Sequence, residues 1–474
     1  MQPPVTLFWV RRDLRLKDNP ALVQASGRGA VVPVFIWEEE AGSHAHWAPG
    51  AAAKVWLHHA LEHFDRSLKA HGSRLIIRLG PALAALRRLI SETGASAVVW
   101  NRRYEPDAID LDTAVKAALR NDGIEAQSFA AALLNEPAQV RNQQGQPFKV
   151  FTAFWKHCTA YVPRRSGMNA PAIIAAPARW PKSVALPRLA LLPAHAWHRT
   201  VVSPWVIGEQ GAWSALEQFA GGALAGYANG RDRPGQEGVS RLSPYVHFGH
   251  LSPVQIIEYL GADEDAAPYI RQLYWRDFAH HLLFHFRASP QRPLNTRFER
   301  FPWRQEETGD GVSAWRGGQT GYPLVDAGMR ELWQTGWMHN RVRMNAASFL
   351  VKHLLVHWRV GAKWFWDTLV DADLANNTMG WQWVAGCGAD AAPYFRIFNP
   401  VLQGERFDPG GTYVRRYVPE LSVLPDKWIH QPWQAPAHVL RAAHVSLDDN
   451  YPRPIVEHGF ARQRALEALA AMGS

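Results

Sequence analysis

The first 130 residues alternate between short apolar runs and longer amphipathic runs. The apolar runs are rich in β-branched and aromatic residues, and they read VTLFWV from Val5, AVVPVFIW from Ala30, SRLIIRL from Ser73 and SAVVW from Ser96. Between them, apolar residues recur at helical spacing, as in AAAKVWLHHALEHFDRSLKA from Ala51. This order of strand, helix and strand predicts a parallel, Rossmann-like α/β sheet. The segment RRDLRLKDN follows the first strand in place of GxGxxG, so the ordinary dinucleotide fingerprint is absent.

The rest of the chain has a different character. Residues 165–205 are rich in proline and alanine and keep no regular period, which predicts a long connector over the surface. Helical spacing then covers 268–286, 322–336, 339–358 and 362–370. We therefore predict an α/β domain at 1–135, a connector at 136–204 and a mainly α-helical domain at 205–474, which a chain of 474 residues is long enough to form.

Composition narrows the range of partners and compartments. The net charge is +9, with 51 basic residues, which favours an anionic partner. The chain has 22 tryptophans, of which 14 lie from Trp205 onward. Two cysteines, Cys158 and Cys387, make no disulfide framework and indicate a reducing compartment. No segment resembles a signal peptide or a membrane span, so we expect a cytoplasmic protein.

The segment from Gly230 to Pro253 combines glycine, arginine and two Ser-Pro pairs. Ser243 and Ser252 each precede a proline, which predicts a capping hydroxyl followed by proline at the first helical position. Ordinary helix capping accounts for either pair alone. The glycines and Arg241 ahead of the first pair favour a phosphate cradle, since free backbone N–H groups at helix starts bind phosphate.

Histidine patterns give no metal site. HALEH, from His59 to His63, matches a zinc-binding pattern, but it lies on an amphipathic helix without a further ligand set, and chance explains it better. The histidines of the helix over 268–286 sit among aromatic residues and are interpreted as core residues. We expect no bound metal.

The stretch DADLANNTMGWQW, residues 371–383, mixes buried-type and polar residues. Its acids can accept hydrogen bonds from ribityl or ribose hydroxyls or pair with Arg343, and Asn377 can bind the edge of a heteroaromatic ring. Trp381 and Trp383 offer indoles that stack or are oxidised. A polar core explains the stretch equally well, and a planar redox cofactor with polar edges is the functional alternative.

Long ordered motifs resemble those of the photolyase/cryptochrome flavoprotein family, most closely its bacterial members that repair cyclobutane pyrimidine dimers. The matching segments, which run nearly end to end, are FWVRRDLRLKDN, PFKVFTAFWK, EGVSRLSPYVHFGHLSP, QLYWRDF, GQTGYPLVDAGMRELWQTGWMHNRVRM, DADLANNTMGWQW and DAAPYFRIFNP. The resemblance implies an N-terminal α/β antenna domain and a C-terminal helical domain that binds FAD. It also implies a DNA photo-lyase, an enzyme that uses light to split dimers flipped out of DNA.

The resemblance assigns an FAD site position by position. The implied contacts are Tyr227, Val239, Ser240, Arg241, Leu242, Ser243, Arg276, Arg343, Asp371, Ala372, Asp373 and Asn377. Asn377 would face the flavin N5. The family usually has a hydroxyl residue where this chain has Val239. Trp381, Trp358 and Trp303 resemble the family's electron-transfer chain for photoreduction, with Trp381 nearest the flavin.

The same resemblance assigns the substrate contacts. Gln272, Trp275, Asn340, Met344 and Trp383 match the dimer pocket, in which two indoles hold the flipped-out dimer. Gln272 stands where dimer-repairing relatives commonly have glutamate. Three further positions match phosphate contacts, and they are Arg231, Arg341 and Arg396. The implied partner is UV-damaged DNA, bound by a monomer that associates with the nucleoid through DNA.

Two other activities occur on this fold. Enzymes for (6-4) photoproducts carry histidines where this chain has Asn340 and Met344, and neither of these can act as a general acid. Cryptochromes, which sense blue light, often replace the residue at Asn377 and append a tail, whereas this chain keeps Asn377 and ends soon after YPRPIVEH. The antenna pigment stays open between methenyltetrahydrofolate, a deazaflavin and none, with Asn101 and Glu105 as candidate contacts.

Overall fold

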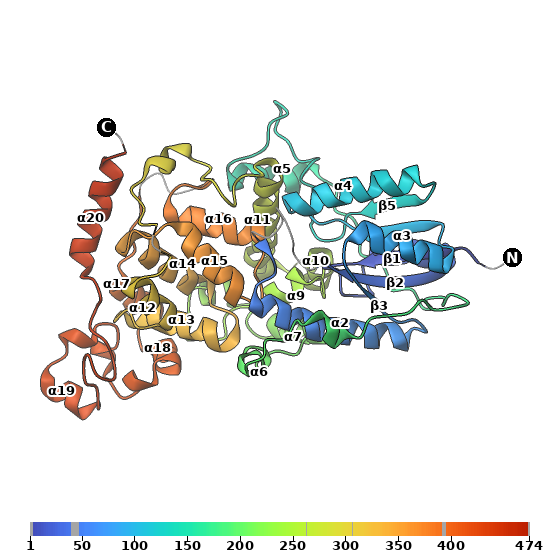
Figure 1. The fold of residues 1–474 in the computed structure, drawn as a ribbon. Coiled ribbons are helices and arrows are strands. Elements are labelled where there is room, and N and C mark those ends of the chain that lie inside the picture. The colour runs from blue at the N-terminus through green and yellow to red at the C-terminus, as the bar shows by residue number, and fades with distance from the viewer. Residues whose placement is uncertain (1–2, 39–46, 262, 306, 391–394, 473–474) are drawn as a thin grey trace. The chain divides into compact units, whose positions relative to one another are not determined.

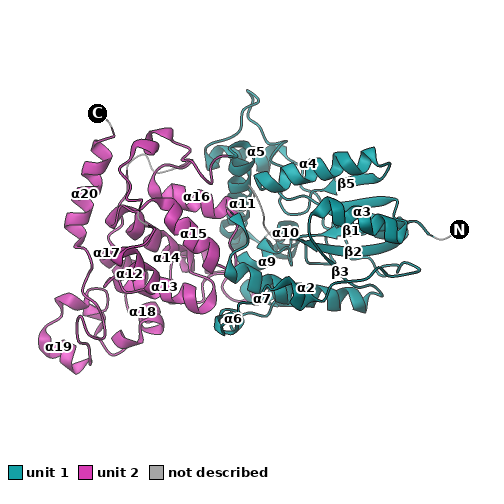
Figure 2. Cartoon of the chain, in the orientation of Figure 1, with its two compact units in different colours: residues 1–220, 241–287 teal, residues 221–240, 288–474 magenta. Residues whose placement is uncertain are grey.

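The computed structural model describes residues 3–38, 47–261, 263–305, 307–390 and 395–472. The chain forms two compact units (Figure 2). Unit 1 comprises residues 1–220 and 241–287, and unit 2 comprises residues 221–240 and 288–474. The predicted domain bounds at 135 and 204 stay a prediction.

Unit 1 contains a parallel five-stranded sheet in the order β3-β2-β1-β4-β5 (Figure 1). The strands are β1 Val5–Val10, β2 Ala30–Trp37, β3 Ile76–Leu79, β4 Ala97–Asn101 and β5 Glu125–Phe129. The four predicted strands are present, and the α/β prediction is confirmed. β5 was not predicted, because EAQSF alternates buried with exposed residues at the edge of the sheet and lacks the apolar run of the others.

Helices surround this sheet. The helices of unit 1 are α1 Pro20–Ser26, α2 Ala51–Ala70, α3 Ala82–Thr93, α4 Pro106–Asn121, α5 Phe151–Tyr161, η2 Leu186–Leu189, α6 Trp197–Val202, α7 Glu209–Gly221, α9 Ser243–His247, α10 Pro253–Leu260, η3 Glu264–Ala266 and α11 Ala267–His285. One face of the sheet, with Leu7, Val32 and Val98, packs on Leu86 of α3 and Leu119 of α4. Burial of this apolar surface is the main stabilising contribution to the layer.

The proline-rich stretch at 165–205 is more ordered than its composition predicts. It contains the short helices η2 and α6. The stretch also hydrogen-bonds to the sheet, because Val31 N donates to Ala175 O and Val184 N donates to Ile77 O. These backbone bonds tie the segment to strands β2 and β3 of its own unit.

Unit 2 is helical, as the apolar spacing predicts. Its helices are α8 Tyr227–Gly230, η4 Thr296–Arg300, α12 Asp310–Gly317, α13 Pro323–Thr335, α14 Asn340–Ser348, η5 Phe349–His353, α15 Trp358–Thr368, α16 Leu374–Ala385, α17 Pro400–Phe407, α18 Thr412–Tyr417, η6 Pro419–Leu421, η7 Asp426–Trp428, η8 Pro432–Gln434, α19 Ala437–Ala442 and α20 His458–Ala470. No helix among the described residues is long and apolar enough to cross a membrane.

The predicted helix over 339–358 is interrupted. It divides into α14, a π-helical turn at η5 and the start of α15. Leu355 has a φ of +56°, which is incompatible with a continuing right-handed helix, and His357 caps α15 by accepting from Arg359 N at 3.1 Å. The break carries a short bridge between Arg304 and Val356, so a tertiary contact overrides the local helical spacing here.

The histidine at position 250 has a defined neutral tautomer in the core of unit 1. Trp56 Nε1 donates to its Nε2 at 3.2 Å, so its Nδ1 carries the proton toward Leu14 O at 3.1 Å. Burial lowers the pKa of His250 to about 3. Protonation would therefore break the bond from Trp56 and place a charge in an apolar environment.

This arrangement predicts acid sensitivity. The folded pKa lies below the unfolded value of about 6.5, so the unfolded chain binds more protons in the window down to about pH 3. The free energy of unfolding should therefore fall as pH falls below 6.5, by about 1.4 kcal/mol per pH unit from this group. His250→Asn should lower the change in unfolding free energy per pH unit by about this amount, as measured by urea unfolding between about pH 6 and pH 4. An unchanged slope would show that His250 does not titrate as described.

Candidate functional site

The segment from Tyr227 to Ser243 has an unusual backbone. A Cβ atom placed on Gly238 would lie 2.5 Å from Gly230 O, so these two backbones touch and only glycine fits. Arg241 has a φ of +52°, in the left-handed region that costs a non-glycine residue about 1–2 kcal/mol. Leu242 follows in the right-handed region. Left-handed and right-handed residues in succession turn neighbouring N–H groups to one side, a geometry that binds anions.

The two predicted serine caps have different outcomes. Ser252 is the N-cap of α10 and forms a capping box with Gln255, in which each side chain bonds the other residue's backbone N–H at 2.9–3.0 Å. The prediction for Ser243 was wrong, because α9 begins at Ser243 itself and Leu242 occupies the N-cap position. The backbone of residues 241–242 turns differently from a standard cap, which the Ser-Pro pattern alone does not reveal.

Helix α11 carries three of the expected site residues in unit 1. Trp275 stacks on Phe151, with ring centroids 3.6 Å apart and planes 9° apart. Arg276 donates to Ala132 O at 2.6 Å. Gln272 Nε2 donates to Pro268 O at 3.1 Å, one turn earlier on the same helix. This bond engages one of the two N–H groups of the Gln272 amide.

Unit 2 gathers the polar residues of the stretch 371–383. Arg343 Nη2 contacts both carboxylate oxygens of Asp371, at 3.1 and 2.8 Å, and its Nε donates to Met338 O at 2.7 Å. Asp373 is the N-cap of α16 and accepts from Asn376 N at 2.8 Å. Asp371 and Asp373 are each only 8% exposed, and Ala372 between them is buried. The ion pair compensates one of the two buried charges, and the helix start stabilises the other.

Asn377 and Trp381 lie on the next turns of α16. Asn377 Nδ2 donates to Ala362 O at 3.0 Å, which leaves its Oδ1 as the acceptor end of the amide. The indole of Trp381, 2% exposed, lies directly on Gly361 of α15. A Cβ atom on Gly361 would lie 2.0 Å from the indole. Glycine is therefore required there to leave space for the ring, and not because of its backbone conformation.

The three expected electron-transfer tryptophans are all buried in unit 2. Trp358 precedes Gly361 by three residues on α15, so it lies on the same face one turn earlier. The ring of His357 lies between the other two, 5.5 Å from Trp358 and 5.8 Å from Trp303 by ring centroids. Trp381 also contacts Trp315 edge-on at 6.2 Å, a neighbour that the sequence did not single out.

Helix α14 presents the residues expected at a DNA surface. Asn340 and Met344 share a face, as their spacing predicts, with Asn340 Nδ2 lying 3.9 Å from Met344 Sδ. Arg341 Nη2 pairs with Asp232 at 2.6 Å, and its guanidinium lies 4.4 Å from the Phe407 ring centre. Asp232 therefore competes with any phosphate for Arg341, which the sequence motifs gave no reason to expect.

The cap of this helix is a buried neutral imidazole. His339 Nδ1 accepts from Arg341 N at 3.2 Å, and burial lowers the pKa of His339 to about 4. At neutral pH the residue is uncharged and holds the start of α14 in place. It positions Arg341 rather than adding a charge of its own.

The remaining expected DNA and substrate residues lie at separate points of unit 2. Arg231 follows α8, and its guanidinium lies 5.5 Å from the ring centre of Tyr227. Trp383 is partly buried and its Nε1 donates to Asp390 O at 3.1 Å. Arg396 is exposed. The expected roles of these residues, and of Val239 and Ser240, stay predictions.

The two antenna candidates are engaged within unit 1. Asn101 is 4% exposed and donates to Asp13 Oδ2 at 2.5 Å and to Asn19 Oδ1 at 2.7 Å. Glu105 pairs with Arg12 at 2.7 Å. Asn101 ends β4, beside β1, where the strand order reverses and where open α/β sheets commonly bind ligands. Its amide holds this edge together, which does not favour a direct pigment contact.

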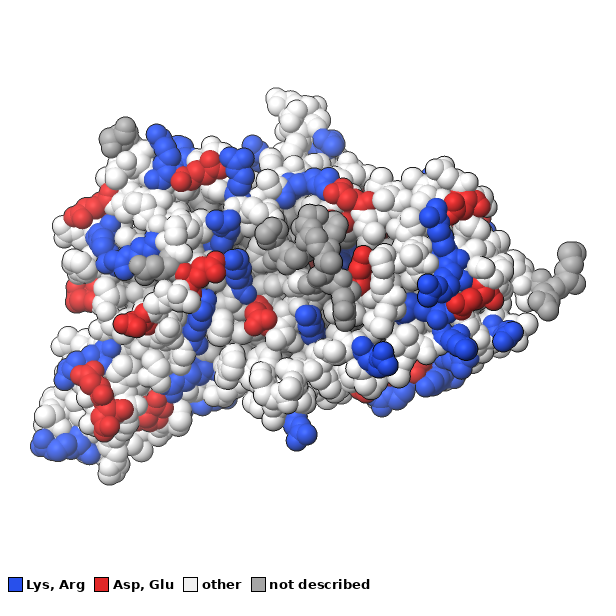
Figure 3. Space-filling view, viewed as in Figure 1, with Lys and Arg blue, Asp and Glu red and all other residues white. Residues whose placement is uncertain are grey.

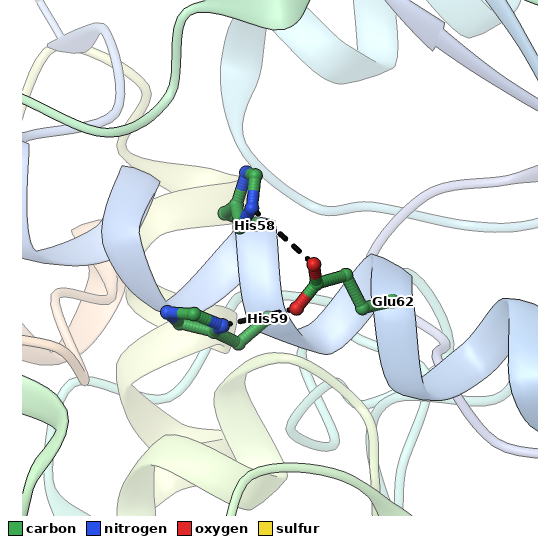
Figure 4. A group of neighbouring side chains, drawn as sticks. All are labelled: His58, His59 and Glu62. Atoms are coloured by element: carbon green, nitrogen blue, oxygen red, sulfur yellow. Dashed lines mark hydrogen bonds and ion pairs between the residues drawn. The ribbon is translucent and has the colours of Figure 1, made fainter. Parts of the chain in front are cut away.

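The zinc-like pattern on α2 forms a small cluster of a different composition. His58 Nε2 and His59 Nδ1 contact different oxygens of Glu62, at 3.5 and 3.1 Å (Figure 4). His63, the second histidine of the pattern, instead packs near Gly208. The candidate ligand atoms all lie within 4.8 Å of one another. Contacts of two imidazoles with one carboxylate account for the cluster, and burial lowers the pKa of His58, which favours its neutral form.

Comparison with known proteins identifies the family. Residues 6–173 match the family model described as DNA photolyase, and residues 269–471 match the model described as the FAD binding domain of DNA photolyase. The chain belongs to the DNA photolyase family. The predicted family and the predicted fold class are therefore confirmed.

Relatives match over nearly the full length. The deoxyribodipyrimidine photo-lyase of Agrobacterium fabrum is 48% identical, over 98% of each chain. Cryptochrome-1 of Arabidopsis thaliana is 40% identical, over 98% of this chain and 70% of its own. The crystal structure of a bacterial class III photolyase from Agrobacterium tumefaciens superposes with a TM-score of 0.94, at 48% identity, over 100% of this chain and 98% of that one.

The residues present fit an FAD. A photolyase FAD-binding domain needs buried acceptors for hydroxyl groups, and Asp371 and Asp373 supply them. Thr378 Oγ1, next to Asn377 on α16, is buried and has no hydrogen-bond partner among the described residues. A buried hydroxyl without a partner costs about 1–3 kcal/mol, so a polar ligand edge would satisfy it.

Three features that shape this site were missed by sequence reasoning. Asp232, Gly361 and Trp315 act only through contacts with residues far along the chain. Of the three, only Gly361 could have been found from the sequence. A glycine in the middle of the helical run at 358–368 costs about 1 kcal/mol, which indicates that a neighbour needs the space.

The contact between Gly361 and Trp381 predicts a specific defect. Gly361→Ala should displace the indole and slow the photoreduction of bound FAD several-fold, while FAD content stays near that of the unmodified photolyase. Blue-light bleaching of the oxidised flavin in the presence of a reductant measures the rate.

The matched control is Gly380→Ala, next to Trp381 on α16, where an added Cβ meets nothing within 4 Å. This control should keep the rate. Equal rates in both variants would contradict the proposed contact between the backbone and the indole.

Proposed function

We propose that this photolyase is a deoxyribodipyrimidine photo-lyase that repairs DNA by splitting cyclobutane pyrimidine dimers in the light. The observation that carries the proposal is the 48% identity to the photo-lyase of Agrobacterium fabrum, which extends over 98% of both chains. The relatives named cryptochromes in Arabidopsis are less similar, at 40% and 39% identity.

FAD is the proposed cofactor. The proposed contacts are Tyr227, Val239, Ser240, Arg241, Leu242, Ser243, Arg276, Arg343, Asp371, Ala372, Asp373 and Asn377. Bound FAD supplies the light-absorbing redox chemistry, and the protein supplies orientation and electrostatics. The turned N–H groups at Arg241 and Leu242 would take the phosphates, and Asn377 Oδ1 would accept from a ring N–H group.

The proposed substrate pocket separates two lesion classes. Trp275 and Trp383 would hold a flipped-out dimer by stacking. Asn340 and Met344 lie together on α14, and neither can deliver a proton as (6-4) repair requires. Gln272 would hydrogen-bond a pyrimidine carbonyl with its amide, which donates without any titration near neutral pH. These residues favour cyclobutane dimers.

DNA binding would rest on single arginines at the site. Basic and acidic side chains are interspersed on the face drawn in Figure 3. The overall charge of +9 assists binding of a polyanion in general. The proposed phosphate contacts are Arg231, Arg341 and Arg396. Arg341 contributes to DNA binding only when its guanidinium leaves Asp232, with which it pairs in this structure.

An antenna pigment is the second cofactor to consider. The alternatives for this chain are methenyltetrahydrofolate, a deazaflavin and no pigment. The absorption spectrum of the purified protein, after subtraction of FAD, distinguishes them. UV-damaged DNA is the proposed partner, so the enzyme would act at the nucleoid.

Light-dependent repair of a defined dimer in duplex DNA tests the function, and Trp381→Phe tests the division of roles. Trp381 packs on Gly361 and is 2% exposed, so in the proposed division of roles it serves only to reduce the flavin. Trp381→Phe should lose photoreduction almost completely. It should still repair dimers in the light when the flavin is chemically reduced beforehand.

Two outcomes would contradict this proposal. Failure of the pre-reduced variant, with FAD and DNA still bound, would place Trp381 at the substrate. Absence of repair by the unmodified protein under the same conditions would favour a light sensor.

Arg341 predicts a measurable salt effect. If it neutralises one phosphate, Arg341→Ala should reduce the slope of log K against log salt by about 0.9 on duplex DNA. Its preference for dimer-containing DNA should stay. Asp232→Ala frees the same guanidinium and should tighten binding to both DNAs, in filter-binding or fluorescence anisotropy titrations. Identical slopes for Arg341→Ala and the unmodified protein would exclude the contact.

A further inference from the structure

A cavity of about 560 Å³ lies in unit 1, beside α4 and the edge strand β5. Four basic and two acidic side chains line it, and they are Arg102, Arg103, Lys116, Arg120, Asp112 and Glu136. Its volume is within the range of sites for small organic molecules. Neither Asn101 nor Glu105, the antenna candidates, lines it.

Both acidic groups of the cavity are already matched by arginines. Arg11 binds the two oxygens of Asp112 at 2.5 and 3.0 Å. Arg102 pairs with Glu136 at 2.9 Å, and Glu136 also accepts from the hydroxyl of Tyr104. The carboxylates therefore have little capacity left to neutralise further cations.

Two cations of the cavity have no such partner. Lys116 and Arg120 form no ion pair with any residue in the described part of the chain, and each makes one hydrogen bond toward β5, to Ser128 Oγ at 2.7 Å and to Ala126 O at 3.3 Å. They stand four residues apart on one face of α4, a spacing at which like charges repel. Burial, and then Arg102 and Arg120, lower the pKa of Lys116. An anion in the cavity would relieve this repulsion.

The walls beside these cations are apolar. Ile109, Ala117, Pro137 and Phe284 line the same cavity. His285 fixes the wall formed by Pro137 through a 3.0 Å bond between its Nε2 and Pro137 O. A surplus of two positive charges next to an apolar wall suits a molecule with a doubly charged group and a flat or aliphatic body.

We propose that this cavity is a binding site for a small organic phosphate of about mononucleotide size. Lys116 and Arg120 bind the phosphate, whose charge of about −1.5 to −2 at pH 7 matches theirs. Phe284 and Ile109 contact the organic part. The site shares no residue with those proposed to bind FAD and DNA. A ligand here would therefore act on the stability of unit 1 or on the rate at which its amide hydrogens exchange.

Calorimetric titration of the FAD-loaded full chain tests the proposal, with AMP, inorganic phosphate and succinate as probes. AMP should bind, inorganic phosphate should bind more weakly because it lacks the organic body, and succinate should bind least. The double variant Lys116→Gln/Arg120→Gln should weaken AMP binding at least tenfold. Unchanged FAD content and thermal unfolding show that it is folded.

The matched control is Arg88→Gln/Lys182→Gln, which removes the same two charges from exposed positions of the same unit. It should keep the affinity for AMP. Equal weakening in both double variants, or no AMP binding by the unmodified protein, overturns the proposal. Succinate binding as tight as that of phosphate would replace it with a site for dianions in general.

Discussion

A single buried guanidinium joins the distant parts of unit 1. Arg15, 1% exposed, donates to the carbonyl oxygens of Asp18, Ala131 and Gly249 at 2.7–3.0 Å. These acceptors lie at the end of the first strand's loop, after β5 and after α9. A buried cation without these partners would be costly, so the three segments are fixed together. Through Gly249 the guanidinium ties the segment 241–287 to the α/β unit to which that segment belongs.

A comparable constraint orders unit 2. The pair between Arg343 and Asp371 joins α14 to the loop before α16, and Asp373 caps α16 directly afterwards. Two buried carboxylates two residues apart would repel each other, and Arg343 compensates the charge of Asp371 while the start of α16 stabilises that of Asp373. Helix α16 is thereby held at its first turn. Asn377 and Trp381 inherit their positions from that turn, so polar interactions at the loop determine where the redox-related side chains lie.

The local spacing of apolar residues predicts much of the architecture. Strands β1 to β4 and helices such as α11 and α13 have sequences in which the apolar spacing, burial and length agree, and they are found where the spacing predicts them. Two of the failures share a cause. β5 pairs with β4 at the edge of the sheet, and the break at Leu355 carries a bridge to Arg304, so both depend on neighbours far along the chain, which single-sequence patterns do not contain.

The candidate site divides in the same way. Residue types such as Asp371, Asn377 and Trp381 could be selected from the motif and from the family resemblance. What those residues touch could not, because Asp232 on Arg341 and Asp13 on Asn101 are tertiary contacts, and the bond from Gln272 to Pro268 is one of several that a glutamine within a helix can make. In each case the partner changes the availability of a group that the sequence alone presents as free.

The contact of Trp381 with the backbone of Gly361 has a consequence for how tightly the redox geometry is maintained. An indole that rests on another long side chain follows the rotamer changes of that side chain. An indole that rests on a main chain can move only with a helix, which is far stiffer. The distance between the backbone of Gly361 and the ring of Trp381 is therefore set by packed main chain. In the electron-transfer role proposed for Trp381, the distance that an electron tunnels should accordingly vary little with temperature or with substitutions elsewhere on the surface of α15.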